Sequence, residues 1–306
     1  MGSAKFIVGL YLILRAPILA GPFFVTSSPP PEEPAPPPFP ELSVLKEAYP
    51  DLTFDPVYDH EQGDWRLVVT AGGRTGVFYR AGGRFLPPDR VGEQDRYRML
   101  IYRYAEQIPD PGRFTEEDIE RIVRFASPEN RSSGRVTPTF FFDLVYDSAS
   151  MEQVERHIVQ VSFLGKKVKI HERIVEPLAR IEAALLRLAE EDPETAAFIH
   201  TLEVVEGYSW RTIRDTAGRS FHSMGIALDL LPAGWQRKTL YWYWERNKGN
   251  DRWMLIPLSE RWMPPLKVIE VFEAHGFIWG GKWPVWDNMH FEYRPELIAG
   301  RSLFTD

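Results

Sequence analysis

The sequence predicts an α+β fold, because segments with the periodicity of strands and of helices follow one another along the chain. Residues 64–86 hold three β-rich runs separated by two copies of Ala-Gly-Gly-Arg, at 71–74 and 81–84. Since Gly-Gly supplies the positive φ that tight hairpins need, this segment predicts a three-stranded meander. Residues 178–188 carry apolar side chains at helical spacing and predict the clearest helix.

Further elements are expected on both sides of these two segments. Helices are predicted at 41–48, 95–107 and 115–125, the last opened by a capping-box pattern from Thr115 to Asp118. Strands are predicted at 140–145, 158–170 and 200–208, the second turning as a hairpin at Gly165. The alternating aromatics at 241–244 favour a half-buried strand over a ligand platform.

Composition narrows the possible functions. The chain has 306 residues, a formal net charge of -7 and 44% hydrophobic residues, which is typical of a globular protein. Mild acidity gives no electrostatic reason to expect nucleic-acid binding. The absence of cysteine excludes disulfides, thiolate metal sites and cysteine nucleophiles. Any metal site must therefore use histidines and carboxylates.

The amino terminus has the pattern of an export signal. Lys5 precedes an apolar run from Phe6 to Leu14, so residues 1–25 are expected to be a signal peptide or a membrane anchor. Residues 26–40 are rich in proline and predict a stiff linker. The folded part is divided into an N-terminal α+β accessory region at 41–169 and a second domain at 170–306.

Two imidazoles and one carboxylate near the end of the chain could hold a metal ion. His222, Asp229 and His290 are a suitable set for a catalytic Zn²⁺, which takes three protein ligands and leaves one position open. Asp287, three residues before His290, could take a proton from the attacking water. Arg211 could stabilise the developing oxyanion. Spacing alone leaves open that these histidines are structural.

The motifs around these residues resemble those of the M15 zinc peptidases, which act on peptidoglycan. The motifs are Ser-x-His-x-x-Gly-x-Ala-x-Asp, ending at Asp229, then Gly-Phe-x-Trp-Gly-Gly-x-Trp, ending at Trp283, and Asp-x-x-His-Phe-Glu, ending at Glu292. The resemblance covers residues 170–298 and implies a small antiparallel sheet that carries the site, backed by the 178–188 helix. It implies these roles: zinc ligands His222, Asp229 and His290, catalytic carboxylate Asp287, substrate-polarising Arg211, and Ser220 beside the substrate.

Some positions depart from the family pattern or have alternatives. Asp287 replaces the Glu of the dipeptidases, which favours the endopeptidase and carboxypeptidase branches. Lys282 follows Gly-Gly where relatives are often acidic. Arg214 is a second candidate for the role of Arg211, and His275 is expected to cap a helix rather than to act in catalysis.

The function that the resemblance implies is zinc-dependent hydrolysis of a peptide bond in the peptidoglycan stem, in the cell envelope, with the N-terminus as a tether if it is not cleaved. Two alternatives remain open. One is a catalytically silent wall-binding domain of the same fold, and the other is an envelope metallopeptidase that acts on proteins. The intact set of ligands and base favours an enzyme over a silent domain.

Overall fold

The computed structural model describes residues 1, 35–213 and 216–304, and the chain divides into two units, 1–37 and 38–306. Apart from Met1, the expected signal or anchor lies outside the described residues, as does most of the expected linker. Among the described residues, no helix combines the length and apolar character needed to cross a membrane. All helices and strands of the described residues lie in the second unit.

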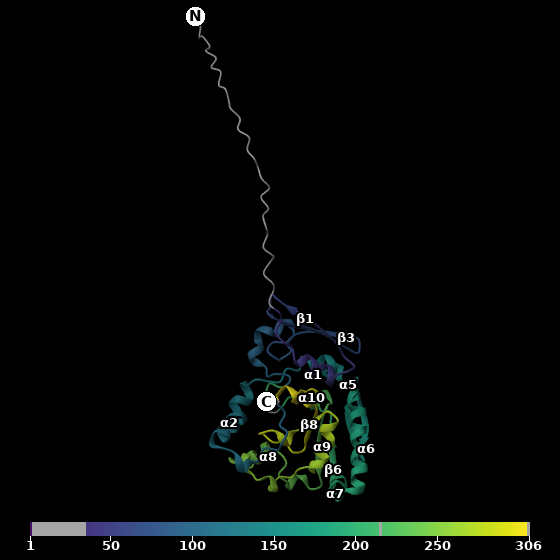
Figure 1. The fold of residues 1–306 in the computed structure, drawn as a ribbon. Coiled ribbons are helices and arrows are strands. Elements are labelled where there is room, and N and C mark those ends of the chain that lie inside the picture. The colour runs from purple at the N-terminus through teal and green to yellow at the C-terminus, as the bar shows by residue number, and fades with distance from the viewer. Residues whose placement is uncertain (2–34, 214–215, 305–306) are drawn as a thin grey trace. The chain divides into compact units, whose positions relative to one another are not determined.

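The structure contains the predicted three-stranded meander, but its three strands begin at Thr53 and not at Asp64. After α1 (Glu41–Ala48), strands β1 (Thr53–Asp59), β2 (Asp64–Ala71) and β3 (Arg74–Tyr79) form an antiparallel sheet in that order (Figure 1). The expected third strand at 84–86 forms only an isolated bridge, because Ala81 and Phe85 have positive φ values of 47° and 55°. Pro56, which weakens a strand pattern, is tolerated because β1 is an edge strand.

The helical region that follows agrees with the sequence in part. Helix α2 (Glu116–Ala126) begins with the predicted capping box between Thr115 and Asp118. The helix predicted at 95–107 is wrong, since a 3-10 helix ends at Arg96 and irregular backbone follows. The strand predicted at 140–145 is also wrong. That segment is helix α4 (Phe140–Val145), which buries three apolar side chains on its inner side: Phe141, Phe142 and Val145. Short helices α3 (Pro128–Ser133) and α5 (Met151–Glu155) flank it.

A hairpin and two helices lead into the second sheet. Strands β4 (Ile158–Phe163) and β5 (Lys166–His171) pair antiparallel, which confirms the predicted hairpin with its turn at Gly165. The predicted 178–188 helix is confirmed within α6 (Val175–Glu191), and α7 (Pro193–Thr201) follows. The strand predicted at 200–208 is shorter than expected, since β6 spans Leu202–Glu206 and His200 lies in α7.

The second sheet has four antiparallel strands in the order β6-β7-β9-β8. Its other strands are β7 (Ala227–Pro232), β8 (Phe277–Trp279) and β9 (His290–Tyr293), with α8 (Trp242–Asn247), α9 (Leu266–Ala274) and α10 (Pro295–Ala299) between or after them. The strand predicted at 241–244 is wrong, because that segment begins α8. Its aromatic spacing serves packing within a local cluster that includes Trp242 and Trp286.

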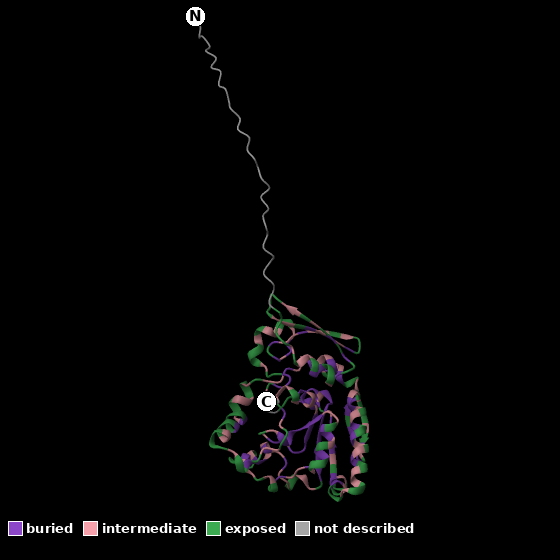
Figure 2. Cartoon of the chain, viewed as in Figure 1, coloured by how far each residue is buried: buried purple, intermediate pink, exposed green. Residues whose placement is uncertain are grey.

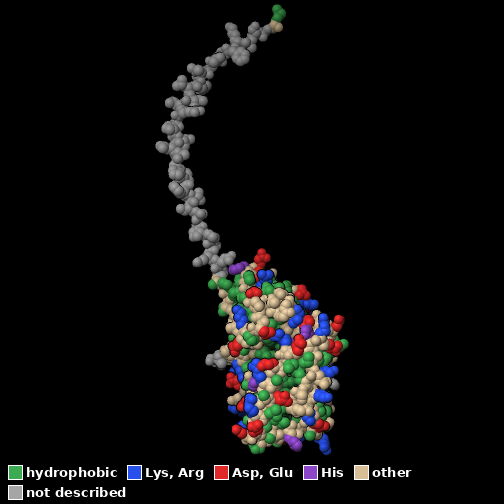
Figure 3. Space-filling view, turned by 90° about the vertical axis from the view of Figure 1, so that its right-hand side faces the viewer, with side chains coloured by type: hydrophobic (Ala, Val, Ile, Leu, Met, Phe, Trp, Pro, Cys, Tyr) green, Lys and Arg blue, Asp and Glu red, His purple; other side chains and the backbone are tan. Residues whose placement is uncertain are grey.

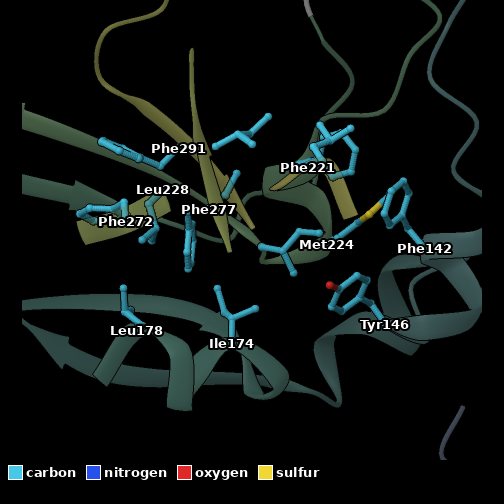
Figure 4. Packing of buried hydrophobic residues seen from close by; sticks show 14 of the residues in the cluster. Phe142, Tyr146, Ile174, Leu178, Phe221, Met224, Leu228, Phe272, Phe277 and Phe291 are labelled. Carbon is cyan, nitrogen blue, oxygen red and sulfur yellow. The ribbon is translucent and has the colours of Figure 1, made fainter. Parts of the chain in front are cut away.

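One hydrophobic core joins the front and back parts of the second unit. Its buried side chains run from Val44 in α1 to Leu297 in α10. Figure 4 shows Phe142 and Tyr146 facing Phe221 and Met224, while Leu178 lies opposite Phe272. Figure 2 shows buried strands at the centre and exposed residues on the outer face of α6. The face in Figure 3 mixes acidic and basic side chains without separating them. The antiparallel sheets and the helices that flank them confirm the predicted α+β fold class.

Candidate metal centre

The second sheet brings the three predicted ligand residues together. Asp229 on β7 lies directly opposite His290 on β9 in the strand register, so the two side chains share one face of the sheet. His222 comes from a 3-10 helix, Phe221–Met224, that immediately precedes β7. All three residues are buried and form a group that could hold a metal ion.

The local sequence around His222 fixes its position. Ser220 caps the 3-10 helix, since its Oγ accepts a hydrogen bond from the His222 amide at 3.3 Å. Gly225 ends that helix with a φ of 69°, and a Cβ there would lie 2.7 Å from the backbone nitrogen of His171. Only glycine combines this backbone conformation with this close approach. The motif spacing from Ser220 to Gly225 therefore presents His222 to the sheet.

The distances between the donor atoms suit one small metal ion. His222 Nε2 lies 3.2 Å from His290 Nδ1 and 3.2 Å from Oδ2 of Asp229. His290 Nδ1 lies 2.8 Å from Oδ1 of Asp229. Ligands bound tetrahedrally at about 2.0–2.1 Å would be separated by about 3.3 Å. The three side chains are thus already spaced nearly as such an ion requires.

The second ring nitrogen of each histidine also has a partner. His222 Nδ1 lies 2.6 Å from the carbonyl oxygen of Gly207, and His290 Nε2 lies 3.0 Å from Oε1 of Glu292. A Cβ at Gly207 would lie 2.2 Å from the carbonyl oxygen of Lys169, so glycine allows this close strand approach. The contacts of the two ring nitrogens, with the Gly207 carbonyl and with Glu292, are of the kind that orients metal-binding imidazoles and raises their basicity.

The charged groups of this site shift one another's pKa values. Burial raises the pKa of Asp229, but His222 and His290 outweigh burial and hold that pKa well below its usual range. Burial lowers the pKa of His290, but its hydrogen bonds with Asp229 and Glu292 raise that pKa well above its usual value. Ionised Asp229 and the proton held by His290 therefore form a buried ion pair, and a metal ion that binds there would take the place of that proton.

Asp287 lies at the turn that leads into β9. Burial is the largest cause that raises the pKa of Asp287 to about 8, and the charges of Asp229 and Glu292 add to it, while His290 opposes them. Its Oδ1 atom is shielded from solvent and has no hydrogen-bond partner among the described residues. A carboxyl group whose pKa lies near neutrality and whose oxygen is unpartnered can exchange a proton with a reactant.

Arg211 and Ser220 both lie near this group, but Arg211 is half exposed and Ser220 is buried. The Nη2 atom of Arg211 is 3.7 Å from Oδ2 of Asp229, and the arginine side chain is 48% exposed. Ser220 is buried, and its hydroxyl is directed to the backbone of its own helix. Arg214, the alternative to Arg211, lies outside the described residues.

Two other sequence candidates have structural contacts. Lys282 is buried, and its Nζ donates a 2.6 Å hydrogen bond to Oε1 of Glu273 on α9. His275 is the C-terminal cap residue of α9, as predicted, and its Nδ1 lies 2.7 Å from the carbonyl oxygen of Val271. Neither contact directs the side chain to the metal centre.

Glu292 belongs to the site, although no role was predicted for it from the sequence. It lies two residues after His290 on the same strand, and such residues share a face. The Asp-x-x-His-Phe-Glu motif contains this signal. Behind Glu292, Nη1 of Arg294 lies 3.6 Å from its Oε2. Arg294 is almost fully buried and also donates a hydrogen bond to the carbonyl oxygen of Leu100 at 3.0 Å.

Comparisons with known proteins agree with this geometry. Residues 213–293 match a family model described as D-alanyl-D-alanine carboxypeptidase, of the M15 peptidases. The matched region contains His222, Asp229, Asp287 and His290, and it begins just after Arg211. Residues 41–102 match a model described as a domain of unknown function. No curated protein and no solved structure matches the chain. The family match supports a peptidase related to those that act on peptidoglycan.

Proposed function

We propose that this protein is a zinc-dependent peptidase that hydrolyses a peptide bond in the stem peptide of peptidoglycan. The observation that carries the proposal is the buried His222, Asp229 and His290 group with Asp287 beside it, inside the region that matches the peptidase family. The protein would act either as a carboxypeptidase, which removes the terminal residue, or as an endopeptidase, which cuts within the stem peptide.

The donor set fits zinc. Two imidazole nitrogens and one carboxylate are the ligands that catalytic zinc sites use, and the donor separations suit tetrahedral binding. A zinc ion held there would polarise the scissile carbonyl and activate a water molecule. Glu292 and the Gly207 carbonyl would keep the two rings in the orientation that binding needs.

In this mechanism, Asp287 is the proton-transfer residue. It takes a proton from the attacking water and passes it to the amine that leaves. With its pKa at about 8, Asp287 is mostly protonated at neutral pH when no cation is present. A positive charge at the neighbouring ligands favours the ionised carboxylate and lowers this pKa. Metal binding would thus convert Asp287 to the ionised carboxylate that can accept a proton.

Arg211 contributes charge at the open edge of the site. Its guanidinium is half exposed and lies within 3.7 Å of a ligand oxygen, so a substrate carbonyl bound at the centre would approach it. An arginine in this position stabilises the negative charge that develops on the carbonyl oxygen.

Digestion of purified peptidoglycan tests the proposal. The zinc-loaded protein is expected to release fragments shortened at one stem-peptide bond, which mass spectrometry identifies. The same preparation of the Asp287→Asn variant should release almost none. Binding of zinc and peptidoglycan without any cleavage by the wild-type protein would contradict the proposal and favour the silent wall-binding domain. Cleavage of unfolded proteins alone would favour the general metallopeptidase.

We also propose that the protein acts in the cell envelope, because residues 1–25 have the pattern of an export signal or anchor. Residues 1–40 fused to a reporter that is active only outside the cytoplasm are expected to give activity. A cytoplasmic reporter would contradict this placement and would remove peptidoglycan from reach.

A further inference from the structure

We propose that a groove beside the metal centre, lined by Lys167, Lys169 and Arg211, binds a carboxylate group of the substrate peptide. This inference builds on the proposed function and specifies which kind of stem peptide the site accepts. The groove has a volume of about 240 Å³ and lies between β5 and the end of β6.

The two lysines lie on the exposed face of β5, which borders the groove. Along β5, Val168 and Ile170 are buried, whereas Lys167 and Lys169 are exposed on the opposite side. The carbonyl oxygen of Lys169 accepts a 2.7 Å hydrogen bond from the amide of Tyr208, which fixes β5 against the chain that leaves β6. The backbone that carries the two lysines is therefore part of a paired hairpin strand and not of a loop.

The groove adjoins the candidate catalytic site. His222 and Arg211 line it together with the two lysines. Since His222 directs Nε2 to the other metal ligands and Nδ1 to the Gly207 carbonyl, its ring separates the groove from the metal position. The groove thus lies on the far side of the His222 ring from the metal position, and Arg211 borders both places.

The groove carries a net positive charge. Within the described part of the chain, neither Lys167 nor Lys169 has an ion-pair partner, and Arg211 approaches only the ligand Asp229. One carboxylate, Glu206, also lines the groove, and the hydroxyl of Tyr208 donates to Glu155 at its edge. Three cationic side chains against Glu206 in the lining and Glu155 at the edge favour an anionic ligand.

In a peptide, the anionic group that such a groove would bind is a carboxylate. Ammonium groups on flexible stems bind a carboxylate as point charges, without the fixed geometry of a paired guanidinium. A peptide with free side-chain carboxylates carries these negative charges, whereas the same peptide with the groups amidated does not. The groove therefore favours the peptide with free side-chain carboxylates over its amidated form.

Binding of a matched pair of peptides tests this inference. The pair is one stem peptide with free side-chain carboxylates and the same peptide with these groups amidated. Calorimetry measures the dissociation constant of each with zinc-loaded Asp287→Asn protein, which should not consume the peptide. The double variant Lys167→Gln/Lys169→Gln is compared with Lys166→Gln, whose side chain does not line the groove.

The double variant is expected to bind the acidic peptide about three- to tenfold more weakly, from two partly exposed charge pairs. The amidated peptide should be unaffected by the double variant, and the Lys166→Gln control should bind both peptides normally. Added salt should reduce the difference between the peptides. Equal affinity for both peptides, or binding of neither, would overturn the inference.

Turnover by the wild-type protein separates this inference from the proposed function. If the protein cleaves both peptides with equal efficiency, the peptidase stands and the carboxylate groove is wrong. If binding depends on the two lysines but no peptide bond is cut, the groove stands and the peptidase is wrong.

Discussion

The hydroxyl of Tyr49 donates a 2.7 Å hydrogen bond to Oε2 of Glu296, which joins α1 to α10 across 247 positions of sequence. Glu296 is fully buried and also accepts a hydrogen bond from Nε of Arg294. Arg294 in turn approaches Glu292, which contacts the candidate ligand His290. A continuous set of buried polar groups thus connects the N-terminal region to the metal centre.

Replacing Tyr49 should destabilise the whole second unit. Tyr49→Phe removes one hydrogen bond to a buried carboxylate, for which the expected loss in free energy of unfolding is about 1–3 kcal/mol. Denaturant unfolding measures this loss. The control is Tyr58→Phe, because the Tyr58 hydroxyl has no hydrogen-bond partner among the described residues. Equal stability of the two variants would show that the buried contact contributes nothing.

Glu292→Gln should weaken metal binding while the ligands remain in place. The substitution keeps the size of the side chain but removes the negative charge that faces His290 Nε2. Loss of such an orienting partner typically costs about 10–100-fold in metal affinity. Competition with a chelator measures the affinity for zinc, with the exposed Glu260→Gln as the control. An unchanged affinity would contradict the role given to Glu292.

His171 should make stability depend on pH in the acidic range. Its Nε2 donates to the Tyr146 carbonyl at 2.9 Å, and its Nδ1 accepts from the Arg173 amide at 3.1 Å, so the neutral ring is satisfied on both sides. Burial, as the largest cause, lowers the pKa of His171 to about 4. The unfolded chain, with a pKa of about 6.5, binds the proton first as pH falls.

The free energy of unfolding should therefore fall between about pH 6.5 and about pH 4, by at most about 1.4 kcal/mol per pH unit from this group. Unfolding curves across this range measure the slope, which should be smaller in His171→Gln than in wild type. The exposed His200→Gln variant should keep the wild-type slope. If His171→Gln also keeps it, another group causes the acid sensitivity.

The sequence predicted those elements whose pattern is local. Three features were predicted in this way: the capping box of α2, the apolar spacing of α6 and the glycine turn of the β4–β5 hairpin. Each depends on residues that lie close together in the sequence. The Phe140–Val145 segment could not be predicted in this way, because a run of aromatic residues suits a buried strand or a buried helix equally. Its packing against Phe221 and Arg294, far along the chain, decides between them.

The candidate site was predictable to a similar extent. The motifs that resemble those of the M15 peptidases predicted His222, Asp229 and His290 as ligands, and the structure brings these residues together. The pairing of β7 with β9 sets their distances, and this pairing joins segments 61 residues apart. The contact between Glu296 and Tyr49 has no sequence motif, because it depends on how α1 packs on α10. Long-range packing therefore supplies the supporting contacts that local patterns do not contain.

Variants of Asp287 and Arg211 should separate metal binding from catalysis. Asp287→Asn removes the proton acceptor and should lower turnover about 10²–10⁴-fold. Arg211→Ala removes the charge that faces the developing oxyanion, a loss of roughly 2.7–4 kcal/mol in transition-state stabilisation. Neither residue is one of the three ligands, so both variants should bind zinc and fold. The measurements are zinc content and turnover of stem peptides for each purified protein.

The exposed Arg237→Ala serves as the matched control and should retain full turnover, because Arg237 lies in a separate 3-10 helix, Trp235–Arg237. Asp287→Asn should also be at least as stable as wild type at alkaline pH, since it removes a buried charge whose pKa is raised to about 8. Near-normal turnover in Asp287→Asn would assign the base elsewhere. Loss of zinc in the same variant would show that Asp287 helps to hold the ion rather than to move a proton.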